Sequence, residues 1–141
     1  MMALQRKLTL PNDINAVSQL NEFIDMLCEE LGIDMPTNMA LNLALEEAVV
    51  NVMSYAYPEG TKGEVGVEAA ADDDRIVFVI TDSGKPFDPT KKDEVDTTLP
   101  LEERSIGGLG IHLIRQIMDE VKYQRRENQN ILTLSKTIKS L

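Results

Sequence analysis

The chain has 141 residues, of which 24 are acidic and 14 basic, so its formal net charge is −10. This length fits one domain over residues 1–141 and leaves no room for a second. The acidic balance argues against direct nucleic-acid binding, because a phosphate backbone is repelled and no basic stripe offsets it. Since no apolar run is long enough for a membrane span or a secretory signal, we expect a cytoplasmic protein with no membrane partner.

The first half of the chain predicts a strand followed by two helices. The strand covers residues 3–10, and apolar residues then recur at helical spacing over residues 14–31, up to the natural stop at Gly32. A second helix is predicted from about Pro36 to the helix-breaking residues 57–60. Its acidic residues lie among core positions, which is unusual for an amphipathic helix.

Two strands and a long irregular segment follow. The strands are predicted at residues 63–71 and 75–81, and the apolar run IVFVI marks the second as central and buried. Periodicity then vanishes between Asp82 and Gly110. A loop of this length in a compact domain is usually a functional lid or disordered.

The last part of the chain predicts a helix and a closing hairpin. Helical spacing returns over residues 111–121, and two strands, 121–127 and 131–138, are separated by Asn128 to Asn130. Helices packed on one face of a mixed, mainly antiparallel sheet are the economical arrangement of these elements. We therefore expect an α+β two-layer sandwich.

Glu47 and Asn51 are the first candidate site residues. They are four residues apart on the second predicted helix, so a carboxylate and an amide share one face. A carboxylate in a cleft can deprotonate a hydroxyl, and an amide oxygen is a hard ligand suited to Mg²⁺. The alternative is a helix whose polar edge happens to hold these residues, and the segment alone favours it.

Asp82 ends the apolar strand, where a buried carboxylate needs a partner. One such partner is the exocyclic amine of adenine, and the same carboxylate would oppose the carbonyl oxygen of guanine. Gly84 would let the backbone turn closely beneath the base. An ordinary Asp-Ser-Gly turn is the alternative.

The stretch SIGGLGIHLIR begins at Ser105 and places glycines before the last predicted helix. Free N–H groups at a helix start are a natural seat for phosphates. One helix end contributes only ~0.3 to 1 kcal/mol, so a cation or metal must help. Arg104 could supply a forked contact to a terminal phosphate, and a solvated arginine in the lid is the equal alternative.

In this order EEAVVN, DSGKPFDP and GGLGIHLIR resemble the N, G1 and G2 boxes of the GHKL ATPases, which share the Bergerat ATP-binding fold. The resemblance extends over residues 41–134. Within that superfamily, EEAVVN followed by YAYP, and a glycine box that continues into Pro-Phe-Asp-Pro, are similar to the small bacterial anti-sigma factors that are serine/threonine protein kinases. Many relatives have a histidine at the position of Tyr55, and we expect this difference to alter packing below the pocket.

The resemblance implies a role for each matched residue. Glu47 is the implied catalytic base, Asn51 the magnesium ligand and Asp82 the adenine contact, while Thr133 on the last strand helps Asp82 to hold the base. Residues 89–107 are the implied lid over the ATP. The implied nucleotide contacts of the glycine boxes are Gly84, Gly107, Gly108, Leu109 and Gly110.

The resemblance also implies an activity and partners. Such a kinase uses ATP and Mg²⁺ to phosphorylate a serine on a STAS-domain anti-anti-sigma protein, binds a sigma factor in its other state, and works as a homodimer. The alternative is a non-catalytic ATP- or ADP-binding module that switches protein partners by lid closure. Phosphate on a partner protein, compared between the unchanged chain and Glu47→Ala, separates the two hypotheses.

Overall fold

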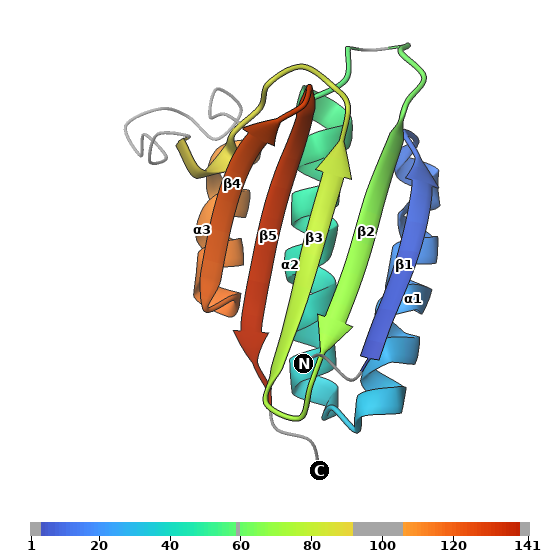
Figure 1. The fold of residues 1–141 in the computed structure, drawn as a ribbon, viewed down its shortest axis with the longest axis vertical. Helices are drawn as coiled ribbons and strands as arrows, with labels where there is room; N and C mark the ends of the chain where they lie inside the picture. Colours follow the sequence, from blue (N-terminus) through green and yellow to red (C-terminus); the bar gives the residue numbers. More distant parts are fainter. Residues whose placement is uncertain (1–3, 59, 92–105, 139–141) are drawn as a thin grey trace.

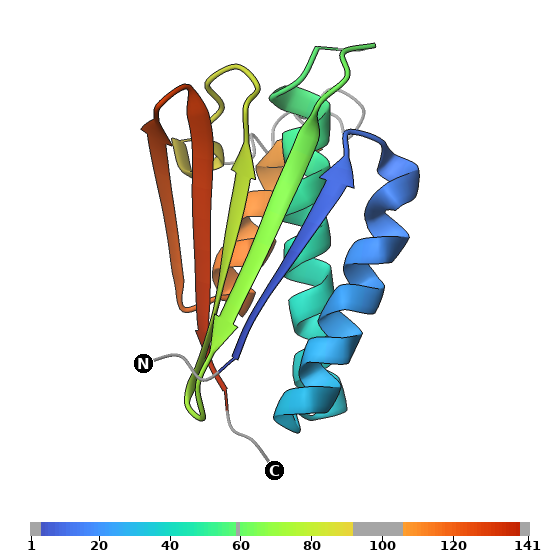
Figure 2. The same cartoon turned by 45° about the vertical axis from the view of Figure 1, so that its right-hand side comes forward.

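The protein is a two-layer α+β sandwich in the computed structural model, which describes residues 4–58, 60–91 and 106–138. A five-stranded sheet, in the order β1-β2-β3-β5-β4, forms one layer. The helices all lie on one side of it, and the other side of the sheet is open (Figures 1 and 2). The expected fold class is therefore confirmed, and every pairing between the described strands is antiparallel.

Short polar side chains cap two of the helical elements, those that begin at Ile14 and Met35. The Asp13 carboxylate accepts from the backbone N–H of Asn15 at 2.9 Å, and the Asp34 carboxylate accepts from that of Thr37 at 2.9 Å. Within the described residues no helix is both long enough and apolar enough to cross a bilayer. The helical elements are η1 (Ile14–Ala16), α1 (Val17–Leu31), α2 (Met35–Tyr55), η2 (Pro89–Lys91) and α3 (Ile106–Ile117).

The sheet contains two hairpins, at residues 64–82 and 120–137, which are joined by the pairing of β3 with β5. The remaining strand, β1, pairs with β2. The strands are β1 (Leu4–Pro11), β2 (Glu64–Ala71), β3 (Arg75–Asp82), β4 (Glu120–Arg126) and β5 (Gln129–Thr137). Only Glu127 and Asn128 connect β4 to β5, with φ of 52° and 65°, as a tight hairpin turn requires. The predicted separation of these strands by residues 128–130 is therefore wrong, because Asn130 is already part of β5.

The hydrophobic core lies between α2 and the covered face of the sheet. Alternate residues of each strand point into it, as the period of two requires. Complete burial of each large apolar side chain contributes roughly 1.5 to 3 kcal/mol, so this layer supplies much of the stability of the fold. The largest fully buried side chains include Leu10, Leu20, Ile24, Leu41, Leu45, Ile76, Phe78, Ile80, Ile114 and Leu134.

Helix α3 begins earlier than periodicity predicts. It starts at Ile106 rather than Ile111, so the glycines of GGLG lie within its first turns instead of before it. Glycine lowers helix propensity by about 1 kcal/mol, which is why the apolar pattern gave no sign of this extra turn. The helix N-terminus, with its free N–H groups, is consequently at residues 106–109.

Candidate functional site

Buried polar side chains are concentrated at one end of the molecule. In the part of the chain that the structure describes, Asn51, Asp82, Asn130 and Ser135 are polar and at most 5% exposed. The first three lie on the covered side of the sheet or on α2, near the end of β3. Because burying polar groups costs free energy unless they are partnered or bind something, this end is the candidate site.

Helices α2 and α3 bring Glu47, Asn51 and Gly110 together. A Cβ atom placed on Gly110 would lie 2.8 Å from Oε2 of Glu47 and 3.0 Å from Nδ2 of Asn51. A side chain at position 110 would therefore have to displace these two groups, whereas glycine lets the backbone of α3 approach them without such a shift. The predicted convergence of the first and third motifs is present in the fold.

The polar groups beside Gly110 suit a phosphate that binds Mg²⁺. A carboxylate and an amide lie beside the first turns of α3, whose free N–H groups favour anions. No group of three or more His, Cys, Asp or Glu in the described ranges could hold a metal by itself. A Mg²⁺ ion here would take Asn51 as a protein ligand and complete its shell with phosphate oxygens and water.

Several predicted site residues lie within or next to residues 92–105, which are outside the described residues. Arg104, and most of the lid at residues 89–107, lie outside the described residues. The described ends of that range are helical, with η2 at Pro89–Lys91 and the start of α3 at residues 106 and 107. Gly107, Gly108 and Leu109 belong to the first turns of α3, where their backbone N–H groups are the phosphate-binding candidates.

Asp82, the last residue of β3, is 2% exposed. Its Oδ1 accepts from the backbone N–H of Gly84 at 2.9 Å and from Nδ2 of Asn130 at 2.9 Å. Burial raises the pKa of Asp82, and these two hydrogen bonds and the charge of Arg125 oppose that rise. A buried carboxylate held in this way is suited to accept from a base amine.

The turn after Asp82 is fastened to the end of α2. The backbone N–H of Lys85 donates to the carbonyl of Ala56 at 2.8 Å, and a Cβ on Gly84 would collide with that carbonyl. Ala56 is five residues beyond Asn51, which is about 7.5 Å along a helix axis. The turn that follows Asp82 is therefore held against the end of the helix that carries Asn51.

The residue beside Asp82 is Asn130, and the expected Thr133 is not there. In the register of β3 with β5, Asp82 pairs with Asn130, whereas Thr133 pairs with Val79. Side chains alternate between faces, so Thr133 lies on the open face of the sheet and Asp82 on the covered face. The structure thus corrects the expectation for Thr133, and the signal that was missed is the two-residue turn before β5.

Tyr55 lies where the α2 end meets the turn after β3. Its ring stacks on that of Phe87 with a centroid distance of 5.4 Å and an interplanar angle of 28°. Phe87 belongs to the Pro-Phe-Asp-Pro run, so the stack joins the first two motifs. Tyr55 therefore packs against the segment that follows Asp82.

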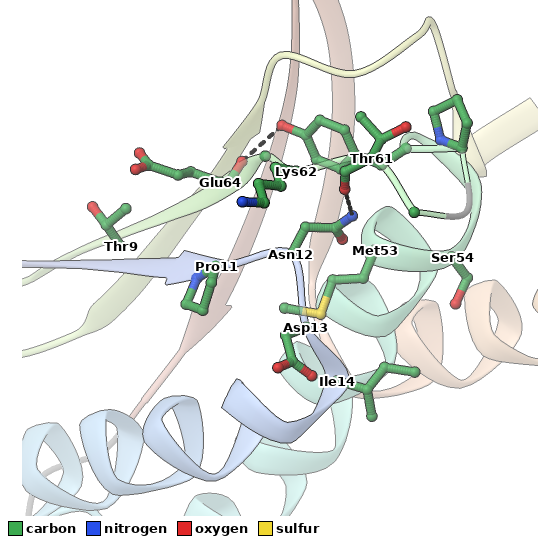
Figure 3. Close-up of a pocket in the computed structure, with 14 residues that line it drawn as sticks. Thr9, Pro11, Asn12, Asp13, Ile14, Met53, Ser54, Thr61, Lys62 and Glu64 are labelled. Carbon is green, nitrogen blue, oxygen red and sulfur yellow. Dashed lines mark hydrogen bonds between the residues drawn. The ribbon is translucent and has the colours of Figure 1, made fainter.

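A separate cavity of about 1290 Å³ lies between the end of β1, the end of α2 and residues 58–64. Figure 3 shows the residues that line this cavity. Among them, Nδ2 of Asn12 donates a hydrogen bond to the carbonyl of Thr61 at 3.2 Å. Its lining includes none of the predicted site residues. The candidate site, between α2, α3 and β3, is therefore distinct from this cavity.

The comparisons with known proteins agree with the geometry of that region. Residues 10–136 match the histidine kinase-like ATPase domain family. The chain belongs to this family. The GHKL resemblance of its three motifs is thereby confirmed.

Curated relatives include serine-protein kinases. The chain is 36% identical over 88 residues to "Serine-protein kinase RsbW" of Bacillus velezensis, a match that covers 60% of this chain and 55% of that protein. It is 28% identical over 134 residues to the protein of the same name from Halalkalibacterium halodurans, covering 92% and 81%. "Serine/threonine-protein kinase BtrW" of Bordetella bronchiseptica is 30% identical over 67% of each chain. In the first of these matches the chain spans about half the length of its relative.

Solved structures share the fold. The RsbU and RsbW domains of Rv1364c from Mycobacterium tuberculosis superpose with a TM-score of 0.69 at 17% identity, over 99% of this chain and 35% of that one. The catalytic domain of the histidine kinase ThkA gives a TM-score of 0.55 at 14% identity, over 98% and 99%. At these identities the similarity concerns the fold alone.

Proposed function

We propose that the chain is an ATP-dependent serine/threonine protein kinase that acts as an anti-sigma factor in a partner-switching system. In this proposal it phosphorylates a STAS-domain anti-anti-sigma protein and binds a sigma factor in the other state. The observation that carries the proposal is the close approach of Gly110 to Glu47 and Asn51. The relatives named serine-protein kinase support the choice of substrate class.

Each part of the site has a role in this reaction. ATP, with Mg²⁺, supplies the phosphoryl group that is transferred. Glu47 orients the attacking serine hydroxyl and takes its proton, Asn51 holds the metal, and the N–H groups of α3 bind phosphate oxygens. Asp82 accepts from the adenine amine at the other end of the nucleotide. Phosphoryl transfer depends mainly on such positioning and charge neutralisation, which these residues provide without covalent chemistry.

The proposal includes a homodimer, and the open face of the sheet is a suitable surface for it (Figures 1 and 2). Its charges include two ion pairs, with Lys7 of β1 3.6 Å from Glu68 of β2, and Lys122 3.1 Å from Glu120 within β4. A surface with balanced charge lets two chains of net charge −10 approach with little repulsion. Sedimentation equilibrium of the unchanged chain tests this, and a monomer at all concentrations rejects it.

Incubation with Mg-ATP and candidate STAS-domain proteins, followed by intact-mass spectrometry, tests the kinase proposal. We expect one phosphate on a serine of the partner. Glu47→Ala should slow the transfer roughly 10²- to 10⁴-fold while ATP affinity changes little, because the base acts on the reacting hydroxyl. Glu46→Ala is the matched control, since it removes a neighbouring half-buried carboxylate from the same helix.

The non-catalytic alternative predicts a different outcome. A module that only binds nucleotide would leave every partner unmodified, with or without Glu47, and would keep its affinity for ATP. ATP binding without transfer to any candidate therefore rejects the kinase proposal and favours the module.

A further inference from the structure

We propose that Asn130 is the positioning residue of the adenine site: its side-chain amide holds the Asp82 carboxylate in the orientation that reads the base. This inference rests on the proposed function, because it concerns the same nucleotide pocket. It assigns to β5 a role that the sequence had placed at Thr133.

The hydrogen-bonding capacity of the Asn130 side chain is fully used by the protein. Its Nδ2 donates to Oδ1 of Asp82 at 2.9 Å and to the carbonyl of Lys85 at 2.8 Å. Its Oδ1 accepts from the backbone N–H of Phe87 at 3.1 Å and from the hydroxyl of Tyr123. An amide has two N–H donors and two acceptor lone pairs, so none is left for a nucleotide. Asn130 can therefore act on the base only through Asp82.

These bonds join several of the elements around the carboxylate. They connect the end of β3 with β5, with β4 through Tyr123, and with the turn that carries Lys85 and Phe87. Arg125 of β4 adds a bond from Nη1 to the carbonyl of Gly84 at 2.8 Å. The turn below the base is thus held from the β4–β5 hairpin as well as from α2.

The arrangement also decides which carboxylate oxygen faces the base. Among the described residues, both donors to Asp82 reach Oδ1, which leaves Oδ2 as the oxygen available to a base amine. An asparagine that is 4% exposed and has all its bonds satisfied is rigid. A rigid acceptor is what discrimination between an amine and a carbonyl on the base requires.

The test compares ATP and GTP binding by isothermal titration calorimetry for the unchanged chain, Asn130→Leu and Asn130→Asp. Leucine has nearly the same size but no hydrogen bonds, so ATP binding should weaken roughly 10- to 100-fold, the range for losing a hydrogen bond to a charged group. The preference for ATP over GTP should shrink as well. Ser135→Ala, which removes another buried polar group from β5, is the control and should change neither quantity.

The pH dependence of ATP binding separates positioning from packing. The groups that face Asp82 are Asn130 of β5, Arg125 and Tyr123 of β4, and the Gly84 N–H. Without the Asn130 amide, the loss of ATP affinity at acid pH should begin at a higher pH. The reason is that one of the interactions that oppose the effect of burial on the pKa of Asp82 is then missing. Asn130→Asp keeps the shape but loses the donor, so its ATP binding should be weak at neutral pH. It should recover as the pH falls, when the two carboxylates share a proton.

The outcomes are distinct. If the unchanged chain binds no ATP, the proposed function and this inference both fail. If the unchanged chain binds ATP, and Asn130→Leu has the same affinity, the same preference for ATP over GTP and the same pH dependence, only this inference is overturned. Should Asn130→Leu fail to fold, Asn130→Asp decides: recovery of ATP binding at lower pH supports the inference, and binding independent of pH overturns it.

Discussion

Both flanks of helix α2 carry polar residues, but the two sets of residues differ in their hydrogen bonding. On the flank toward α1, Asn42 accepts from Asn21 at 3.0 Å and donates to Asp25 at 3.1 Å and to the Asn38 carbonyl at 3.1 Å. On the flank toward α3, no hydrogen bond between described residues joins Glu47 to Asn51, and both approach Gly110.

This difference separates a structural polar cluster from a candidate site. The side chains on the α1 flank satisfy one another, so their bonds set the register of two helices. The α3 flank instead places polar side chains beside a glycine and a helix N-terminus, where a ligand can supply the missing partners. Polar residues in a helix interface therefore indicate a site when their neighbours on the next element are backbone groups.

The largest effect in this comparison is expected from Gly110→Ala. The added methyl group would lie within 3.0 Å of both polar side chains on α2, so they must move. We expect phosphoryl transfer to fall roughly 100-fold, since small displacements of catalytic groups have effects of that size. The melting temperature should stay the same or rise, because alanine favours a helix by about 1 kcal/mol over glycine.

Gly66→Ala provides the matched control for that variant. A Cβ on Gly66 would meet only the carbonyl of Thr81 at 3.8 Å, an ordinary contact on the open face of the sheet. Its kinase rate should equal that of the unchanged chain. Equal rates for Gly110→Ala and Gly66→Ala would show that the close approach at the α3 flank has no functional role.

Asp82→Asn is expected to have a smaller effect, which weakens ATP binding but raises stability. ATP affinity should fall roughly tenfold or more, because an amide N–H would then face the adenine amine. Stability at neutral pH should rise by about 1 kcal/mol, since the variant keeps an acceptor for Asn130 and Gly84 but removes a buried charge. Urea unfolding and nucleotide titration measure the two effects.

The pH dependence of that stability difference follows from the raised pKa of Asp82. The folded chain holds the proton more tightly than the unfolded chain, whose aspartate titrates near ~3.9. The stability of the unchanged chain relative to Asp82→Asn therefore falls as the pH rises from about 4 through the folded pKa, and then stays level. A difference that is the same at pH 4 and pH 8 would contradict this account.

The smallest expected effect on function comes from the α1 flank. Asn42→Ala removes the bonds to Asn21, Asp25 and Asn38 and should lower the free energy of unfolding by about 1 to 2 kcal/mol. ATP affinity should not change. Met39→Ala, at a site 65% exposed on the same helix, should alter neither property by more than about 0.5 kcal/mol. Weaker ATP binding by Asn42→Ala would remove the distinction between the two flanks.

Much of the fold was predictable, because local patterns specify it. Helical spacing located α1 and α2, and alternation located the strands, to within a few residues. The start of α3 was missed, since the glycines at its start interrupt the apolar helical pattern. The turn between β4 and β5 was placed too late, because asparagine is common in turns and gave no sign that Asn130 is buried.

The sequence by itself determined that Glu47 and Asn51 share one helix face and that Asp82 ends a buried strand, because both follow from the period of a single element. Only the tertiary structure decided that Gly110 meets the first pair and that Asn130, not Thr133, stands beside Asp82. Both facts depend on how distant segments are aligned. In a sheet, a two-residue turn sets that alignment, and a shift by one residue moves a side chain to the other face.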